Sequence, residues 1–318
     1  MLLSPHREAL LSGEPDFSKR RAGDLPPCRP VEAEGDERIQ RTTAESFGAQ
    51  WKTFRQMQKD YGPLFDAYFD GIDVAQFRGR EVLDAGCGMA RWAVFWARAG
   101  AEVFAVDLGS AVESAAVNLR EYSNAHVVQA DLLRLPFEAG TFPAVYSMGV
   151  LHHLPSPESG FRAVAAQVAS GGTLGVYLYY SLENRSAFHR TLLGAARQFR
   201  RVTVRLPYPA LKGLGGCLAV LFTASLVGPA RVLHALGFRR AASAVPLSQY
   251  APLEFRVLYT DMVDRFGAPL EHRFSRAQVR GFYERAGFPA AAISEAPPYW
   301  HAWGRRPAAS PGEQSPRG

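Results

Sequence analysis

Three carboxylates stand at the ends of short apolar runs in the first half of the 318-residue chain. Asp84 lies near the end of EVLDAG, Asp107 ends EVFAVD, and Asp131 ends HVVQAD. A single aspartate behind a strand is often only a helix cap, but three in succession beside a glycine turn indicate a ligand site. Such carboxylates can accept hydrogen bonds from hydroxyl and amino groups and attract a cation.

The turn that follows Asp84, GCGMARW, restricts the class of ligand. It lacks the Gly-Lys-Ser/Thr ending of a phosphate-binding loop, and Arg91 stands where a dinucleotide fingerprint needs its third glycine. Asp84 would repel a pyrophosphate but suits a cationic group. With Asp107 placed for two ribose hydroxyls and Asp131 at the adenine edge, the predicted ligand is a cationic adenosine compound without phosphate. S-adenosyl-L-methionine meets that description.

The surrounding pattern predicts the elements that position these carboxylates. Short apolar runs alternate with helical stretches, which indicates a parallel sheet covered on both faces. The predicted strands are 81–86, 102–107, 126–131, 142–150 and 173–180. Right-handed crossovers bring the carboxyl ends of such strands to one edge. Because 290–296 and 299–306 are typical of a closing hairpin, we expect a doubly wound α/β fold. Its sheet is mostly parallel and seven-stranded, with an antiparallel closing hairpin and a helical insert after strand five.

Changes in composition along the chain predict six segments. They are a disordered leader at 1–40, N-terminal helices over the cofactor site at 41–78, a Rossmann-like cofactor-binding core at 79–180, a basic and apolar helical insert at 181–253, closing helices and strands at 254–306, and a disordered tail at 307–318. Phe47 and Trp51 share one face of the leading helix, where they either cover the cofactor or pack in the core.

Two helix starts carry a capping-box signature, in which a hydroxyl residue precedes a Glu or Gln by three positions. Thr42 with Glu45 predicts the start of the leading helix. Ser275 with Gln278 predicts the start of the last helix.

Beyond these features, four successive stretches resemble the motifs of class I S-adenosyl-L-methionine-dependent methyltransferases. They are VLDAGCGMARW, VFAVDLG, ADLLRLPFEAGTFPAVYSMGVLHHL and GGTLGVYLYY. The nearest group is the small-molecule branch that includes quinone-biosynthesis C-methyltransferases. The resemblance covers about 79–180 and returns at HRFSRAQVRGFYERAGF. It departs at Ala90, where many members carry a third glycine, so we expect a slightly altered turn.

The resemblance implies a role for each matched residue. The methionine end of the cofactor would lie against Asp84, Gly86 and Gly88, and Ala85 and Cys87 between them are also expected to bind the cofactor. Asp107 would hold the ribose, Leu108 would lie against the adenine, and Asp131 and Leu132 would border the adenine edge. Ser147 and Met148 would line the path from the sulfonium to the acceptor.

Methyl transfer from a sulfonium needs mainly alignment of the acceptor, and a base only where the acceptor must lose a proton. His152 and His153, just past the fourth strand, are the catalytic candidates, although paired histidines there also suit a helix cap or a pocket wall. Lesser candidates are Tyr180, Tyr250, His272 and His301. We find no acidic metal cluster and expect no metal. The predicted acceptor is a small, lipophilic molecule methylated on oxygen or carbon.

The insert carries the basic charge of the chain. Residues 184–253 contain ten Lys or Arg and no Asp or Glu, and residues 213–230 are uncharged. The segment suits either a cap over the substrate pocket or an element lying on an anionic membrane surface, and both favour a lipid-like acceptor. We do not expect nucleic acid as a partner, because long aliphatic runs, not aromatic residues, separate the arginines.

The remaining expectations concern location and class. Three widely spaced cysteines, Cys28, Cys87 and Cys217, indicate a reducing compartment, and the first residues lack a secretory signal. We therefore expect a cytoplasmic protein that can be peripheral at the inner membrane surface. The alternative function is a non-catalytic module that binds S-adenosyl-L-methionine or attaches to a membrane.

Overall fold

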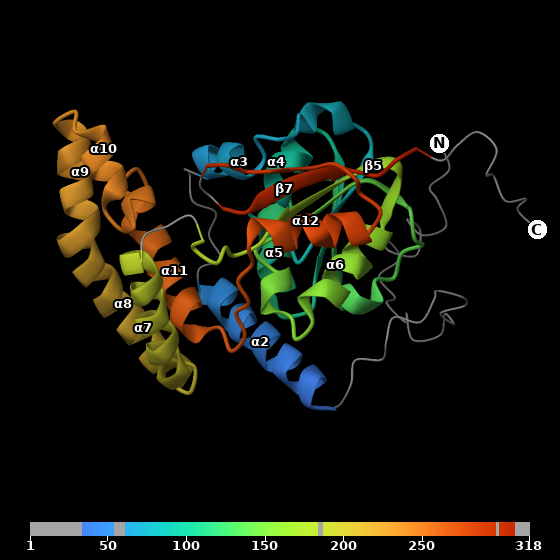
Figure 1. Ribbon diagram of the computed structural model, residues 1–318. Coiled ribbons are helices and arrows are strands. Elements are labelled where there is room, and N and C mark those ends of the chain that lie inside the picture. The colour runs from blue at the N-terminus through green and yellow to red at the C-terminus, as the bar shows by residue number, and fades with distance from the viewer. Residues whose placement is uncertain (1–33, 54–60, 184–186, 297–298, 309–318) are drawn as a thin grey trace, which may run out of the picture. The chain divides into compact units, whose positions relative to one another are not determined.

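The computed structural model describes residues 34–53, 61–183, 187–296 and 299–308 (Figure 1). Most of the predicted leader and tail therefore lies outside the described residues. The chain divides into two compact units. The core unit comprises Met1–Glu183 and Leu270–Gly318, and the insert unit comprises Asn184–Pro269.

The core unit is built on a seven-stranded sheet whose strands lie in the order β3-β2-β1-β4-β5-β7-β6. The strands are β1 (Glu81–Ala85), β2 (Glu102–Asp107), β3 (Ala125–Gln129), β4 (Phe142–Met148), β5 (Val168–Tyr177), β6 (Ala291–Ile293) and β7 (His301–Arg305). The first five are parallel, and β7 pairs antiparallel with β5 and β6. The predicted fold class, including the closing hairpin and the insert after strand five, is confirmed.

Side chains of each central strand alternate between two hydrophobic cores, as the pleat requires. Val82 packs in the core under α3 (Gly62–Tyr68), α4 (Ala93–Arg98) and α5 (Ala111–Leu119). Leu83 packs in the core under α6 (Pro157–Ala166) and α12 (Arg276–Arg285). Both side chains are fully buried. This two-sided burial explains why the strand sequences are continuously apolar until the strand ends.

The two predicted helix starts had different outcomes. The capping box of Ser275 and Gln278 is present at the start of α12. The one at Thr42 is wrong, because α2 (Glu34–Thr53) begins eight residues earlier, within the predicted leader. Thr42 lies inside this helix, and its hydroxyl donates to the carbonyl of Arg38 at 2.9 Å.

Strand boundaries also differ from the predicted ones. Strand β5 begins at Val168, five residues before the predicted start, and β3 ends at Gln129. Asp131 therefore does not close a strand. It caps a short 3-10 helix, Leu132–Arg134, by accepting the amide of Leu133 at 2.9 Å. Two further 3-10 helices are Val74–Phe77, before β1, and Leu151–His153, after β4.

The regular secondary structure of the insert unit, in its described residues, consists of helices joined by turns. It contains α7 (Ala187–Thr203), α8 (Tyr208–Phe222), a π-helical turn (Thr223–Val227), α9 (Gly228–Ala235), α10 (Arg239–Ala244), a 3-10 turn (Ser248–Tyr250) and α11 (Phe255–Gly267). Helix α11 packs against α7 and α8, and the Thr203 hydroxyl donates to the carbonyl of Phe266 at 2.7 Å. The insert unit thus extends to Pro269, beyond the predicted boundary at 253.

Helices α8 and α9 run on through the π-helical turn as one 28-residue stretch, Tyr208–Ala235, and an 18-residue window within it has a mean hydropathy of 1.8. By length and composition alone it could cross a membrane, and among the described residues it is the one helix that could. The strands on either side of the insert, β5 and β7, pair in one sheet. A single crossing would put these paired strands on opposite sides of a bilayer, so topology argues against a span.

Candidate active site

Asp84 and Asp107 come together at the carboxyl edge of the parallel sheet. Strands β1 and β2 are neighbours, with Asp84 opposite Ala105 and Ala85 opposite Val106. Asp107 is the next residue of β2, so both carboxylates stand at the same edge. This is the edge at which ligands of doubly wound sheets bind.

The glycine turn after β1 is held against β2 by backbone hydrogen bonds. The amides of Gly86 and Cys87 both donate to the carbonyl of Val106 at 2.8 Å. Gly86 has a φ of +88°, and a Cβ there would lie 2.5 Å from a methyl carbon of Val150. Only glycine satisfies both conditions, because other residues are strained at this φ and have no room. The turn therefore brings bare backbone to the strand edge.

Ala90 stands where many of the methyltransferases that the turn resembles carry a third glycine. The backbone conformation of Ala90 explains that preference for glycine. Its φ is +64°, in the left-handed region. A residue with a Cβ costs roughly 1–2 kcal/mol there. The turn still forms, with the amide of Ala90 donating to the carbonyl of Cys87 at 2.8 Å.

The Asp107 carboxylate is oriented by two backbone amides. Gly88 donates to one oxygen at 2.9 Å and Gly109 to the other at 3.0 Å. Burial raises the pKa of Asp107, and these amides, with that of Leu108, oppose the rise. Each carboxylate oxygen has a second lone pair, so the fixed carboxylate can still accept two hydroxyl donors. That geometry fits the two hydroxyls of a ribose.

Asp84 is buried without a hydrogen bond of good geometry to either oxygen among the described residues. Burial is the main cause that raises its pKa to about 8, and the Tyr146 hydroxyl beside it opposes the rise. The charge of Asp107 adds to the rise, whereas Arg91 opposes it. Unpartnered buried carboxylate oxygens are costly and need an explanation. A cationic ligand group at this point would supply one, which fits the amino-acid end of S-adenosyl-L-methionine.

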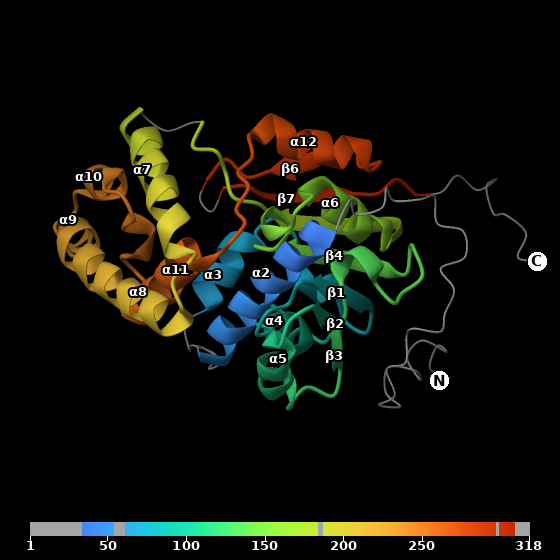
Figure 2. The ribbon, with the colours of Figure 1, turned by 90° about the horizontal axis from the view of Figure 1, so that it is seen from below.

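Helix α2 lies against the same edge, in front of the strand ends in Figure 2. The Gln40 amide donates to Asp131 at 2.9 Å. Trp51 packs on the glycine turn, with its indole nitrogen 3.1 Å from the point where a Cβ of Gly88 would stand. The helix therefore touches both the turn and the third carboxylate. Sequence reasoning missed Gln40, because an amide on a polar helix face carries no signal of its distant partner.

Arg91 is a second residue that sequence reasoning left without a role in the site. Its guanidinium stacks on three aromatic rings, with centroids at 5.4 Å for Trp51, 5.5 Å for Tyr61 and 4.7 Å for Trp92. Cation–π contacts of this kind stabilise by roughly 0.5–2 kcal/mol each. Arg91 thus ties α2 and Tyr61, the N-cap residue of α3, to the turn beside Asp84.

Several predicted cofactor residues are packed inside the protein instead of lining the edge. Ala85 and Leu132 are buried in the core under α6, whereas Cys87 and Met148 are buried in the opposite core. The Ser147 hydroxyl is buried and donates to the carbonyl of Ala85 at 2.7 Å, which joins β4 to β1. Leu108 is half-buried directly after β2. The buried side chains of this group support the strand edge from below, whereas Leu108 keeps a partly exposed side chain beside Asp107.

The thiol of Cys87 is not a reactive group in this structure. Burial raises its pKa well above the ordinary value, and the carboxylates of Asp107 and Asp84 raise it further. The thiolate, which is the nucleophilic form, is therefore disfavoured.

The two histidines after β4 occupy different environments. His153 Nδ1 lies 2.6 Å from the carbonyl oxygen of Leu270. Because a carbonyl can only accept, Nδ1 carries the proton and the neutral ring has its lone pair on Nε2. The ring also packs on Phe47 of α2, with centroids 4.8 Å apart. His153 is thus oriented beside the helix that covers the strand edge.

His152 has no exposed surface, and neither ring nitrogen has a hydrogen-bond partner among the described residues. Its ring stacks on Tyr179 with centroids 3.8 Å apart. Burial lowers its pKa well below the ordinary value, and His153, Arg273 and His272 lower it further. His152 is therefore uncharged at neutral pH and packs as an aromatic ring.

A buried ion pair stands next to these histidines and was not predicted. Arg273 Nε donates to Glu271 at 2.7 Å, and both side chains are less than a tenth exposed. The Arg273 guanidinium also lies over the Tyr179 ring at 5.3 Å. Sequence reasoning missed the pair because charged residues are rarely buried and local pattern does not reveal burial.

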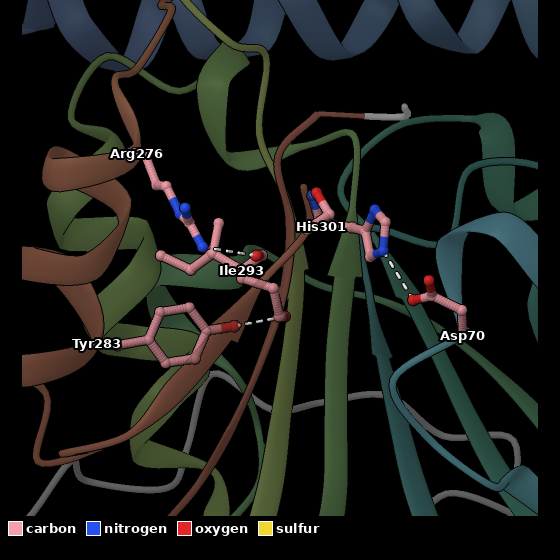
Figure 3. A network of polar contacts seen from close by, with 7 residues as sticks. Asp70, Arg276, Tyr283, Ile293 and His301 are labelled. Atoms are coloured by element: carbon pink, nitrogen blue, oxygen red, sulfur yellow. Dashed lines mark hydrogen bonds and ion pairs between the residues drawn. The ribbon is translucent and has the colours of Figure 1, made fainter. Parts of the chain in front are cut away.

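The lesser catalytic candidates are held in structural contacts. His301 opens β7 opposite Tyr177, and its Nε2 lies 2.8 Å from the Asp70 carboxylate (Figure 3). The amide of His272 donates to the carbonyl of His152 at 2.9 Å, and Tyr180 forms a β-bridge with Phe274. Tyr250 belongs to the insert unit, where its hydroxyl bonds Asp261 at 2.6 Å.

The closing strands are fastened to α12 on the other side of the sheet from Asp70, as Figure 3 shows. The Tyr283 hydroxyl donates to the carbonyl of Ala302 at 2.7 Å, and Arg276 donates to that of Ile293 at 3.3 Å. These contacts fix β6 and β7, and hence the start of β7 at the site edge.

No group of three or more His, Cys, Asp or Glu side chains suited to a metal ion is found in the described part of the chain.

Comparison with known proteins identifies one domain. Residues 82–172 match the model of a family described as "Methyltransferase domain". Among curated proteins, the ubiquinone biosynthesis O-methyltransferase of Bordetella avium (strain 197N) is 33% identical over 126 residues, which are 37% of this chain and 49% of that protein. The corresponding protein of Albidiferax ferrireducens is 36% identical over 128 residues, 37% and 47% of the two chains. This chain thus spans about half the length of the curated relatives it matches.

The solved structures that match this chain are more distant in sequence. An O-methyltransferase family protein from Burkholderia thailandensis is 15% identical, with a TM-score of 0.47 over 79% of this chain and 57% of that chain. The S-adenosylmethionine-dependent methyltransferase SibL is 19% identical, with a TM-score of 0.45 over 78% and 55%.

Proposed function

We propose, from the premise that residues 82–172 are a class I S-adenosyl-L-methionine-dependent methyltransferase domain, that this chain methylates a small, lipophilic acceptor on oxygen or carbon. The observation that carries the proposal is the pair of carboxylates, Asp84 and Asp107, gathered around the Gly86–Gly88 turn at one sheet edge. S-adenosyl-L-methionine is the cofactor that this domain implies, and it supplies a methyl group already activated by the sulfonium charge.

The roles proposed for the chain's residues follow from their contacts. Asp107, fixed by two amides, would accept the ribose hydroxyls, and Asp84 would face the cationic amino-acid end. Asp131 already uses one oxygen for both Gln40 and Leu133, so its second oxygen would serve the adenine amino group. The acceptor atom would then lie in line with the bond between the cofactor's sulfur and its methyl group. Helix α2, which lies over this edge, would exclude water from it.

His153 is the residue that we propose as base where the acceptor atom carries a proton. Its Nδ1 is committed to the carbonyl of Leu270, which leaves Nε2 as the basic atom of the ring. His152 is the weaker candidate, since burial disfavours its charged form. A proton taken by His153 from an acceptor hydroxyl would leave the oxygen as the nucleophile for the methyl group.

The proposed function is tested with a cofactor carrying an isotope-labelled methyl group, incubated with the purified protein and cell extract. The expected result is label in a small, organic-soluble product that depends on the protein. Label absent from every extract fraction, while the folded protein still binds the cofactor, would favour the rival function, a non-catalytic binding module.

We also propose that the insert unit attaches the protein to an anionic membrane surface on the cytoplasmic side. Its basic stretch, residues 184–253, has ten cations and no carboxylate, and each cation near such a surface contributes about 1 kcal/mol. Flotation with anionic vesicles should retain the protein at low salt and release it at high salt. Retention that is insensitive to both salt and lipid charge would contradict the electrostatic part of the proposal.

A further inference from the structure

An open groove of about 1030 Å³ runs along α8 in the insert unit, between that helix and the start of α11. Its lining is almost wholly apolar. The lining residues are Pro209, Lys212, Gly213, Gly216, Cys217, Val220, Leu221, Ala224, Phe255 and Tyr259. All of them belong to the insert unit, so the groove is a feature of that unit alone.

The lining residues of α8 and the turn after it recur every three or four positions, so they form one continuous helix face. From Pro209 to Ala224, at 1.5 Å per residue, this face is roughly 22 Å long. The hydrocarbon core of a bilayer is about 30 Å thick, so one leaflet contributes about half of that. The groove is therefore long enough to hold an acyl chain from one leaflet.

Large apolar side chains stand open at the groove. Val220 is 61% exposed, Leu221 56% and Phe255 44%. Contiguous apolar surface of this kind on a soluble protein usually marks a place where another apolar body binds. Small residues along the floor, Gly213 and Gly216 among them, leave the depression that these side chains border.

The charge around the groove indicates which apolar body fits. Lys212 is the one charged residue in the lining, near the N-terminal end of α8. None of the lining residues is acidic, and the carboxylates of the insert unit, Glu254, Asp261 and Asp264, belong to α11 and its N-cap. Not every cation of the insert unit is available to a ligand, since Arg231 donates to the carbonyls of Ala251 and Leu253. An apolar groove with a cation near one end is complementary to a molecule that has a long hydrocarbon chain and an anionic head group.

We propose that this groove binds the acyl chain of an anionic phospholipid of the bilayer, with the phosphate at Lys212. The inference rests on the membrane attachment proposed above and not on methyl transfer. It goes beyond general attraction of a basic segment, because it assigns one helix face and predicts that this face enters the lipid. A lipid site of this kind would hold the protein where a lipophilic acceptor dissolves.

The native Cys217 provides a direct probe, because it lines the groove and is an exposed free thiol. Cys87 is buried, and Cys28 can be removed by Cys28→Ser. We expect vesicles containing phosphatidylglycerol to slow maleimide labelling of Cys217 at least tenfold, and phosphatidylcholine vesicles to leave it unchanged. A thiol at Val117→Cys, in a background with Cys217→Ser, is the control. Val117 is 48% exposed on α5 of the core unit, and its labelling should not change.

A charge in the groove should weaken attachment. Leu221→Glu places a carboxylate at a site that is already 56% exposed, so its cost in folding is small. Loss of apolar contact plus repulsion from the anionic surface should reduce partitioning into phosphatidylglycerol vesicles at least tenfold. Val117→Glu adds the same charge on α5 and should partition as the wild type does. Both variants should bind S-adenosyl-L-methionine as the wild type does, which separates this test from that of the methyltransferase function.

Each other outcome overturns the inference. The protein could float with vesicles in a salt-sensitive way while Cys217 is not protected and Leu221→Glu partitions normally. That result would show that the protein attaches to the membrane by charge alone, without lipid in the groove. Protection of Cys217 that needs no vesicles and rises with protein concentration would show that a second copy of the chain covers the groove. Absence of flotation in the wild type would remove both the lipid site and the membrane attachment.

Discussion

Asp84 should lose a proton when the cofactor binds. In the protein without ligand, burial raises the pKa of this carboxyl to about 8. At pH 7 about one tenth of the molecules then carry an ionised Asp84. A ligand whose cationic group lies against the carboxylate favours the ionised form, so binding at pH 7 should release about 0.9 proton per site.

The same carboxyl sets a pH dependence of stability in the ligand-free protein. An unfolded Asp has its pKa near 3.8, and the folded value is raised. Between these values the folded state holds a proton that the unfolded chain has lost. Stability is therefore greatest at the low end of this range and falls as the pH rises towards 8. At about 1.4 kcal/mol per pH unit, the full effect is about 6 kcal/mol, and a bound cation would reduce it.

The assay is calorimetric titration at pH 7 with the demethylated product of the cofactor, which keeps the cationic amino group. Buffers with different ionisation enthalpies report the number of protons released. In Asp84→Asn, which cannot ionise, we expect release near zero and weaker binding. Equal heats in all buffers for the wild type, together with an affinity that does not change from pH 6 to 8, would refute the reasoning about Asp84.

Two further predictions concern the base and the turn. For an acceptor that must lose a proton, His153→Asn should lower the rate of methyl transfer roughly 10²–10⁴-fold and leave the cofactor affinity unchanged. His152→Phe keeps the ring stacked on Tyr179, so this variant should stay active. Equal losses in both variants, measured by initial rates, would contradict the assignment of the base. Ala90→Gly removes the strain of a left-handed φ, but it also removes a buried methyl group and raises the conformational entropy of the unfolded chain. Because these effects offset one another, we expect the free energy of unfolding to change by less than about 0.5 kcal/mol. In α4, where no such strain exists, Ala97→Gly should cost about 2 kcal/mol in the same denaturant titration, and equal costs would show that Ala90 is unstrained.

The parts of the fold that sequence predicted are those governed by local pattern. The continuously apolar runs around Leu83 and Phe104 predicted buried parallel strands, and parallel pairing then fixed the common edge of Asp84 and Asp107. Ser275 and Gln278 predicted a helix start because both partners of the capping box lie within one turn.

The parts that sequence did not predict depend on contacts between distant residues. Thr42 has the spacing of a capping box, yet the chain is already helical from Glu34, where acidic residues favour the helix N-terminus. Helix α11 joins the insert unit because its residues, such as Val263, pack on Gly215 of α8, a contact between segments about 50 residues apart. The bond from Gln40 to Asp131 spans 91 residues and leaves no local trace.

The central claim is that the strand-end carboxylates hold S-adenosyl-L-methionine, and calorimetric titration with this cofactor tests it most directly. The account predicts one site per chain in the micromolar range, and a loss of at least tenfold in affinity in Asp107→Asn, which keeps one side-chain acceptor for the Gly88 and Gly109 amides. A folded wild-type protein that gives no binding heat and no rise in melting temperature with the cofactor would contradict it.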